Sequence, residues 1–155
     1  RYFHDLRQSI DLYEYREGIS PLFVSYYTPG PPYEPLADQL RRSLDRLNLP
    51  HRIERLDSCG TWVANTGQKA AIVQSAWDAS DGPVCWVDAD AEVLRAPEFL
   101  FANPFDIACV RRNGWYDISS FVYFAKTPAA ASALASSIIR SPSSPRPCTL
   151  NPPSA

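Results

Sequence analysis

The chain has 155 residues, 45% of them hydrophobic and 21% charged, which suits one soluble globular domain with a single core. The formal net charge is −2 and the basic residues are scattered, so the composition argues against nucleic-acid binding. No apolar run approaches the roughly 20 residues that span a bilayer, and the four cysteines include no CxxC pair. We therefore expect a reduced cytoplasmic protein, with peripheral attachment to a membrane left open.

Hydrophobic periodicity and turn residues predict strands that alternate with helices. In chain order the expected elements are a helix over 1–17, a strand over 22–27, a helix over 34–48, a short strand over 51–56, a turn-rich segment over 58–67, a helix over 68–77, strands over 83–87, 106–110 and 119–127, and a helix over 128–140. This alternation is typical of βαβ units. The sequence predicts an α/β fold with a mainly parallel sheet covered on both faces.

Domain boundaries follow from changes in composition. Residues 1–18 read as an N-terminal helical extension and residues 19–140 as one domain. Residues 141–155 are dominated by serine and proline without a periodic apolar face, so we expect a disordered tail.

The apolar spacing also predicts which side chains face the core. In the two central helices these are Leu36, Leu40, Leu44 and Leu47, and then Ala71, Ile72, Ser75 and Ala76. Cys85 and Cys109 each lie inside an apolar run, where a free cysteine behaves as a small core residue.

The strand over 83–87 is followed by two aspartates, Asp88 and Asp90. In an extended segment their side chains share one face, and Glu92 joins them if the extended geometry continues. Ligands of open parallel sheets bind beyond the carboxyl ends of strands. Paired carboxylates repel unless a cation lies between them, and hard oxygen ligands favour Mg²⁺ or Mn²⁺ together with substrate phosphates. The pattern predicts a site for a metal and a diphosphate.

Other interpretations use the same two aspartates. They are common turn residues and can satisfy backbone groups at the end of a strand. The pattern also resembles the first motif of haloacid-dehalogenase-type phosphatases, with Asp88 as nucleophile and Asp90 as general acid. That motif normally lies on the first strand of its domain and continues with glycine and threonine, whereas Ala91 and Glu92 follow here. A calcium loop would need further oxygen ligands and a glycine.

Four segments in a fixed order carry a more specific resemblance. They read VSYYTPGPPYEPLADQLRRSL, SCGTWVANTGQKAAIV, PVCWVDADAEVLRAP and DISSFVYFAKTPAAASAL. Together they resemble nucleotide-sugar glycosyltransferases with the GT-A fold, and most of all bacterial nucleotide-diphospho-sugar transferases with a DxD motif. The similarity covers about residues 22–138. It implies a GT-A arrangement of the α/β fold.

The resemblance implies a nucleotide-binding role for one group of residues. Tyr26, Tyr27 and Thr28 occupy the end of the first strand, where this family holds the base and the ribose. Lys69 matches a basic residue that approaches the nucleotide or the DxD carboxylates. Either tyrosine could instead be a core aromatic, and Lys69 a solvated surface lysine.

For the DxD pair, the resemblance implies that Asp88 contacts the ribose and shares the ion, and that Asp90 ligates the metal directly. A second group would line the sugar or acceptor pocket: Trp62, Asn65, Ser119 and Ser120. Asn65 could equally cap the helix that follows it. The family usually has a glycine beside the two serines, and this chain does not.

The function implied is a metal-dependent transfer of a sugar from a nucleoside-diphosphate sugar, most simply a UDP-sugar, to a hydroxyl acceptor, with Mn²⁺ or Mg²⁺ as the cofactor. The similar part of the sequence ends near Arg140, and no histidine follows the predicted sheet to complete an ion site. Asp117 is a candidate base by position alone. A truncated, catalytically incomplete nucleotide-sugar-binding domain is the alternative.

Overall fold

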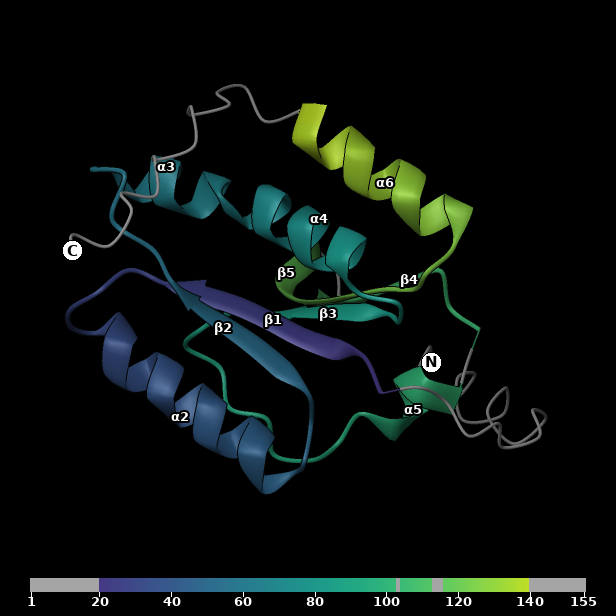
Figure 1. The fold of residues 1–155 in the computed structure, drawn as a ribbon, viewed down its shortest axis with the longest axis horizontal. Coiled ribbons are helices and arrows are strands. Elements are labelled where there is room, and N and C mark those ends of the chain that lie inside the picture. Colours follow the sequence, from purple (N-terminus) through teal and green to yellow (C-terminus); the bar gives the residue numbers. More distant parts are fainter. Residues whose placement is uncertain (1–19, 103, 113–115, 140–155) are drawn as a thin grey trace.

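The structure is a computed structural model that describes residues 20–102, 104–112 and 116–139 (Figure 1). The N-terminal helix expected within 1–18 and the disordered tail expected over 141–155 lie outside these residues. The described elements, in chain order, are β1 (Leu22–Tyr27), α2 (Tyr33–Arg46), β2 (His51–Arg55), α3 (Trp62–Gly67), α4 (Lys69–Ala79), β3 (Val84–Val87), α5 (Glu98–Ala102), β4 (Ile107–Arg112), β5 (Tyr116–Phe124) and α6 (Pro128–Ile139).

The five strands form one sheet in the order β2-β1-β3-β5-β4. Strand β1 is central to the parallel part, where Phe23 pairs with His51 of β2 and with Cys85 of β3. Strand β5 runs antiparallel to β3 and to β4, so four strands point one way and β5 points the other. The predicted α/β fold with a mainly parallel sheet is confirmed.

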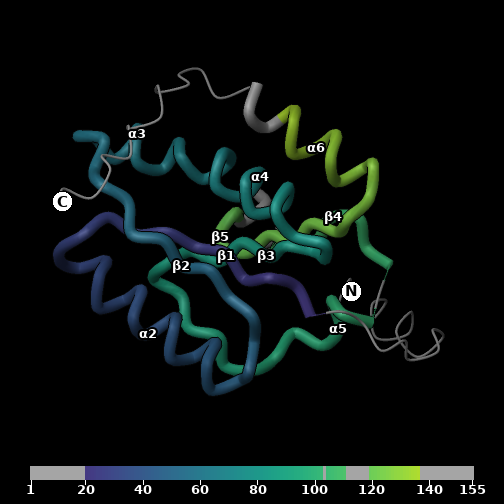
Figure 2. Tube along the Cα trace, viewed as in Figure 1, coloured from purple at the N-terminus to yellow at the C-terminus, as the bar shows by residue number. Residues whose placement is uncertain are grey.

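Helices cover both faces of the sheet, as Figures 1 and 2 show: α2 and α5 lie on one face, and α3, α4 and α6 on the other. Successive side chains of β1 and β3 alternate between the faces. On the α2 face the buried cluster consists of Phe23, Leu40, Leu44, Leu49, Cys85, Val87, Leu100 and Tyr123, and on the α4 face of Val24, Ile72, Val73, Ala76, Val84, Trp86 and Leu134. Burial of each large apolar side chain contributes about 1.5–3 kcal/mol. Both clusters fix the carboxyl ends of β1 and β3.

Helix α2 buries a stripe that is narrower than the leucine spacing predicts. Its fully buried residues are Ala37, Leu40, Ser43 and Leu44, whereas Leu36 and Leu47 are only half-buried. The helix ends at Arg46, and two residues later Asn48 adopts a left-handed φ of +51°. Asparagine tolerates this conformation, which satisfies the last carbonyls of a helix and turns the chain toward β2.

Two expectations about the segment between β2 and β3 are wrong. The turn-rich segment over 58–67 contains a helix, α3, whose first turn is capped by Thr61. In α4 the buried residues are Ile72, Val73 and Ala76, while Ala71 and Ser75 are exposed. The tertiary contacts rotate the stripe toward Val73 because α4 packs on β3 and also beside α6 (Figure 1).

Among the cysteines in the described residues, Cys85 is buried, Cys59 is half-buried and Cys109 is exposed, and all three are free thiols. The core position expected for Cys85 is confirmed, and that for Cys109 is wrong because β4 is the edge strand of the sheet. In the described part of the chain, no helix has both the length and the apolar character that crossing a membrane requires.

Candidate functional site

A cavity of about 430 Å³ lies at the carboxyl ends of β1 and β3. The chain leaves β1 through α2 on one face and reaches β3 through α3 and α4 on the other (Figure 1). The two connections diverge here and leave a crevice, the position where open α/β sheets bind ligands. The lining residues are Tyr26, Tyr27, Thr28, Tyr33, Trp62, Asn65, Thr66, Lys69, Trp86, Asp88, Ala89, Asp90 and Ser119.

The charged part of the cavity is organised around the carboxylate of Asp88. Its Oδ1 accepts a hydrogen bond of 3.0 Å from Lys69 Nζ and one of 2.6 Å from Trp86 Nε1. Lys69 Nζ also donates to the carbonyl oxygen of Ser119 and lies 4.6 Å from the centroid of the Trp86 ring. Helix α4 and strand β3 therefore meet at one carboxylate oxygen, and Lys69 connects both to β5.

The predicted extended geometry of the two aspartates is wrong. Strand β3 ends at Val87, and the amide of Ala91 donates to the carbonyl of Asp88 at 3.0 Å, which closes a β-turn over 88–91. Aspartate favours such turns because it tolerates their backbone geometry. Within the described residues the Asp88 side chain does not cap the turn, since its contacts are with Lys69 and Trp86. Both aspartates nevertheless line the cavity.

Asp90 and Glu92 have different surroundings. The Asp90 side chain is exposed at the cavity and has no hydrogen bond or ion pair among the described residues. Glu92 does not join it, because its carboxylate accepts from Gln39 at 3.1 Å and lies 3.6 Å from Arg46.

The segment after the turn is held on α2. The hydroxyl of Ser43, a fully buried residue, accepts from the amide of Val93 at 3.0 Å. Together with the Glu92 contacts, this bond fixes the position of the turn that carries Asp88 and Asp90.

Tyr26 and Asn65 connect β1 to α3. The Tyr26 hydroxyl donates to the carbonyl of Asn65 at 2.5 Å. The side chain of Asn65 does not cap the following helix, which was its alternative role. Instead its Oδ1 accepts from the amide of Cys59 at 2.6 Å and closes the loop before α3, the helix that Thr61 caps. The N-cap position of α4 is Gln68, whose side chain forms no capping hydrogen bond.

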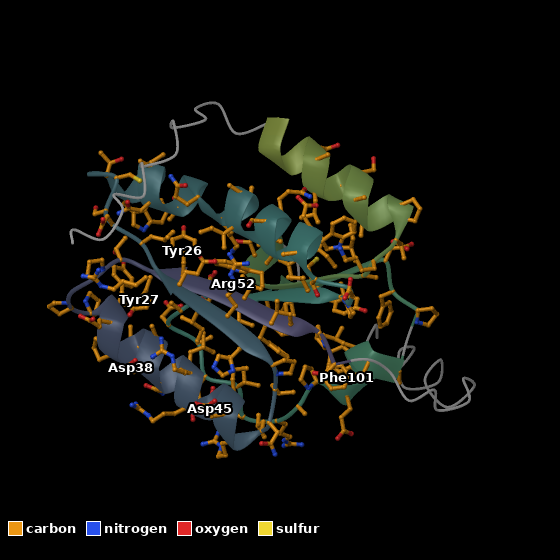
Figure 3. The ribbon with its side chains drawn as sticks, viewed as in Figure 1. Tyr26, Tyr27, Asp38, Asp45, Arg52 and Phe101 are labelled. Atoms are coloured by element: carbon orange, nitrogen blue, oxygen red, sulfur yellow. The ribbon has the colours of Figure 1, made fainter. Side chains whose placement is uncertain are left out.

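Three predicted aromatic residues, from β1 and α3, line the cavity. Tyr26 and Tyr27 stand on opposite sides of β1 at its carboxyl end (Figure 3), and both line the cavity. Trp62 also lines it, although 71% of its surface is exposed. The Trp62 ring is therefore accessible both from the cavity and from solvent.

The two serines of β5 have different positions. Ser119 lines the cavity, and its carbonyl holds Lys69. Ser120 is not among the lining residues. Its carbonyl accepts from the amide of Asp88 at 3.0 Å, so its contact with the site is through the backbone. The side chain of Asp117 lies outside the described residues.

Two groups in the cavity have shifted pKa values. Burial, followed by the charges of Asp88 and Cys59, raises the pKa of the Tyr26 hydroxyl to about 12. Burial lowers the pKa of Lys69, and the neighbouring carboxylate of Asp88 opposes that effect. Burial therefore disfavours the charged form of both groups.

Asp88 and Asp90 are the oxygen donors that a metal ion would use here. Among the described residues, no group of three or more His, Cys, Asp or Glu side chains is placed to hold an ion. Mg²⁺ commonly takes one or two carboxylates and completes its shell with water and substrate phosphates. The donor set therefore fits an ion that binds together with a diphosphate.

Sequence reasoning missed Tyr33, Thr66, Trp86 and Ala89 as lining residues. The sequence assigned Trp86 only to the strand over 83–87, and the residue is 3% exposed in the structure. The usable signal was its position two residues before Asp88, because residues at that spacing share a face where the backbone is extended.

Comparisons with known proteins place the fold. No model of a protein family matches the sequence, and no curated protein matches it. The structure is similar to the crystal structure of a glycosyltransferase involved in the glycosylation of the major capsid of PBCV-1, with a TM-score of 0.53 and 14% sequence identity. The similarity covers 77% of this chain and 65% of that one, so the chain spans less than two thirds of the neighbour. At this identity the similarity establishes a shared fold.

Proposed function

We propose that this chain forms the donor-binding domain of a metal-dependent glycosyltransferase. It binds a nucleoside-diphosphate sugar, with UDP-sugars as the first class to test, and transfers the sugar to a hydroxyl acceptor. The observation that carries the proposal is the cavity at the carboxyl ends of β1 and β3, which combines an aromatic wall with a lysine and two carboxylates. The fold shared with a glycosyltransferase supports the same reaction class and a GT-A arrangement.

The aromatic and charged parts of the cavity suit different parts of such a donor. Tyr26 and Tyr27 end β1 and offer ring surface to a base and ribose. Asp88 and Lys69 lie beyond them, at the end of β3 and the start of α4. A donor that crosses the crevice from β1 to β3 places its diphosphate beside the Lys69 ammonium.

The charge balance of the cavity supports a divalent ion. Its lining residues carry one cation, Lys69, and two carboxylates, Asp88 and Asp90. A diphosphate would therefore meet a wall with an excess of negative charge, which opposes binding unless a cation accompanies it. When bound, Mn²⁺ or Mg²⁺ would offset the charge that builds on the departing diphosphate. Asp90 is the freer ligand of the two because Asp88 already accepts from Lys69 and Trp86.

The acceptor side of the proposal rests on Trp62, Asn65 and Ser119. Trp62 and Ser119 belong to different elements, α3 and β5, and both have exposed surface at the cavity. The exposed ring of Trp62 offers an apolar surface for a sugar, and Asn65 keeps α3 in place through Cys59 and Tyr26. Acceptor and donor would then meet above Asp88 and Asp90.

Calorimetry of UDP with and without Mn²⁺ tests donor binding. We expect UDP binding to require Mn²⁺ and to weaken about 10- to 100-fold in Asp90→Ala, because a carboxylate ligand to the ion is lost. Asp81→Ala is the matched control, since Asp81 is an exposed aspartate just before the amino end of β3, away from the cavity. Metal-independent binding that Asp90→Ala leaves unchanged would contradict the proposal.

Turnover of a panel of UDP- and GDP-sugars then separates transfer from binding alone. Release of free sugar or of UDP from one donor, abolished by Asp90→Ala, supports the transferase. Tight metal-dependent binding without turnover of any donor would identify the alternative, a nucleotide-sugar-binding domain that is catalytically incomplete.

A further inference from the structure

Trp86 lies at the base of the cavity and has no assigned role. Its side chain is 3% exposed, within the buried cluster on the α4 face of the sheet. A buried indole N–H normally finds an acceptor, because leaving it unpaired costs the desolvation energy of the donor. Here the acceptor is a carboxylate oxygen of Asp88, at 2.6 Å.

The bond from Trp86 selects one oxygen of Asp88. Trp86 Nε1 and Lys69 Nζ both donate to Oδ1, and no described residue donates to Oδ2. About 37% of the Asp88 side chain is exposed. One oxygen is thus fixed by the protein, and the carboxylate still has surface open to the cavity.

The two donors differ in how firmly they are held. Lys69 is attached through a flexible side chain, and its ammonium can move toward a phosphate when a ligand enters. The indole cannot follow, because its ring is buried against Tyr26 at 5.5 Å between centroids and within a close-packed core. The rigid donor is therefore the one that keeps the Asp88 carboxylate in a single orientation.

We infer that Trp86 is a positioning residue for ligand binding: its indole N–H fixes Oδ1 of Asp88, so that Oδ2 is presented to the cation and donor without a loss of rotational freedom. This inference rests on the proposed function for the identity of the ligand. The contact between Trp86 and Asp88 can be tested without any ligand.

Trp86→Phe is the decisive variant, because it keeps an aromatic ring in the core and removes the N–H. Trp77→Phe is the matched control, since Trp77 Nε1 also donates one hydrogen bond, at 2.9 Å, but to the backbone carbonyl of Ala125 and not to a side chain of the cavity. We expect Trp86→Phe to bind UDP with Mn²⁺, and Mn²⁺ alone, about tenfold more weakly. Trp77→Phe should bind both as the wild type does.

A double-mutant cycle separates positioning from general disruption of the core. In an Asp88→Asn background, Trp86→Phe should have no further effect on either affinity, because the residue that Trp86 acts on no longer carries its charge. An unchanged affinity in the single variant would overturn the inference. So would an effect of Trp86→Phe that persists in full when Asp88 is already replaced.

The indole resonance of Trp86 in a ¹⁵N–¹H spectrum supplies a readout that needs neither UDP nor metal. It is assigned by its loss in Trp86→Phe, and we expect it to move upfield in Asp88→Asn, since a neutral amide oxygen is a weaker acceptor than a carboxylate. A resonance that does not move overturns the inference even if UDP binds. A resonance that moves in a protein that binds no UDP contradicts the proposed function and leaves the coupling of Trp86 to Asp88 in place.

Discussion

The described residues place a lysine ammonium over a tryptophan ring at each end of α4. At the first residue of the helix, Lys69 lies 4.6 Å from the ring centroid of Trp86. Near its last turn, the ring of Trp77 lies 3.8 Å from Lys126. The two pairs have the same residue types, and they differ in the hydrogen-bond acceptors that surround them.

The first pair lies beside the cavity and donates to a carboxylate, whereas the second pair donates to backbone carbonyls. Asp88 accepts from both members of the first pair. In the second, Trp77 donates to the carbonyl of Ala125, and Lys126 donates to the carbonyl of Trp77. Backbone carbonyls are already fixed, so the second pair joins α4 to the end of β5. The same arrangement of a cation over an aromatic ring thus occurs both beside the cavity and away from it, and only the pair beside the cavity includes a partly exposed carboxylate.

Of the replacements in the two lysine–tryptophan pairs, that of Lys69 should change ligand affinity most. In Lys69→Met the side-chain volume stays and the cation is lost, so UDP with Mn²⁺ should bind about 10- to 100-fold more weakly. Mn²⁺ alone should bind more tightly, because the ammonium no longer neutralises Asp88. Calorimetry measures the first affinity and electron paramagnetic resonance the second. If both affinities fall together, Lys69 supports the cavity structure rather than the phosphate.

Tyr26 packs on Trp86 and should make the free energy of unfolding depend on pH. Its pKa is raised from 10.0 to about 12 in the folded protein, so the unfolded chain ionises first. The stability that the protonated hydroxyl contributes is complete below pH 10 and is lost as the pH rises through about 12.

We therefore expect Tyr26→Phe to be about 1 kcal/mol less stable than the wild type at neutral pH, because the bond to Asn65 is lost. That difference should shrink as the pH rises above 10.0. Urea unfolding across the alkaline range measures it, and a difference that stays constant with pH would show that Tyr26 ionises equally readily in both states.

Replacement of Lys126 should have the smallest effect. An exposed cation over an aromatic ring contributes about 0.5–1 kcal/mol, so Lys126→Met should lower the free energy of unfolding by that amount. Its affinity for UDP with Mn²⁺ should equal that of the wild type. Weaker nucleotide binding in this variant would mean that the far end of α4 also controls the cavity.

Much of the fold could be read from the sequence because its signals are local. The bounds of β1 agree with the apolar run from Leu22, and those of α6 with the alanine-rich segment from Pro128. Local composition failed at α3, where Gly60 and Gly67 suggest turns. That helix depends on the Thr61 cap and on contacts with Tyr26 that the sequence does not display.

The sequence likewise predicted part of the candidate site and missed another part. An apolar run followed by aspartates placed Asp88 and Asp90 at a strand end, yet the alternation rule misplaced their geometry, because the chain leaves the sheet at Val87 and turns. The apolar run over 83–87 also includes Trp86 without showing where its N–H points. The partner of that N–H depends on the packing of β3 and on the turn that carries Asp88.

Hydrophobic periodicity and turn chemistry act over a few neighbouring positions, so the sequence was enough to predict the five strands, the helices α2, α4 and α6, and the residues that end β1 and β3. That Lys69 reaches Asp88, 19 positions along the chain, and the carbonyl of Ser119, 50 positions along, follows from the packing of the fold. Such contacts depend on how α4 packs across β3 and β5. The cavity and its charge network exist because three segments distant in sequence share one edge of the sheet.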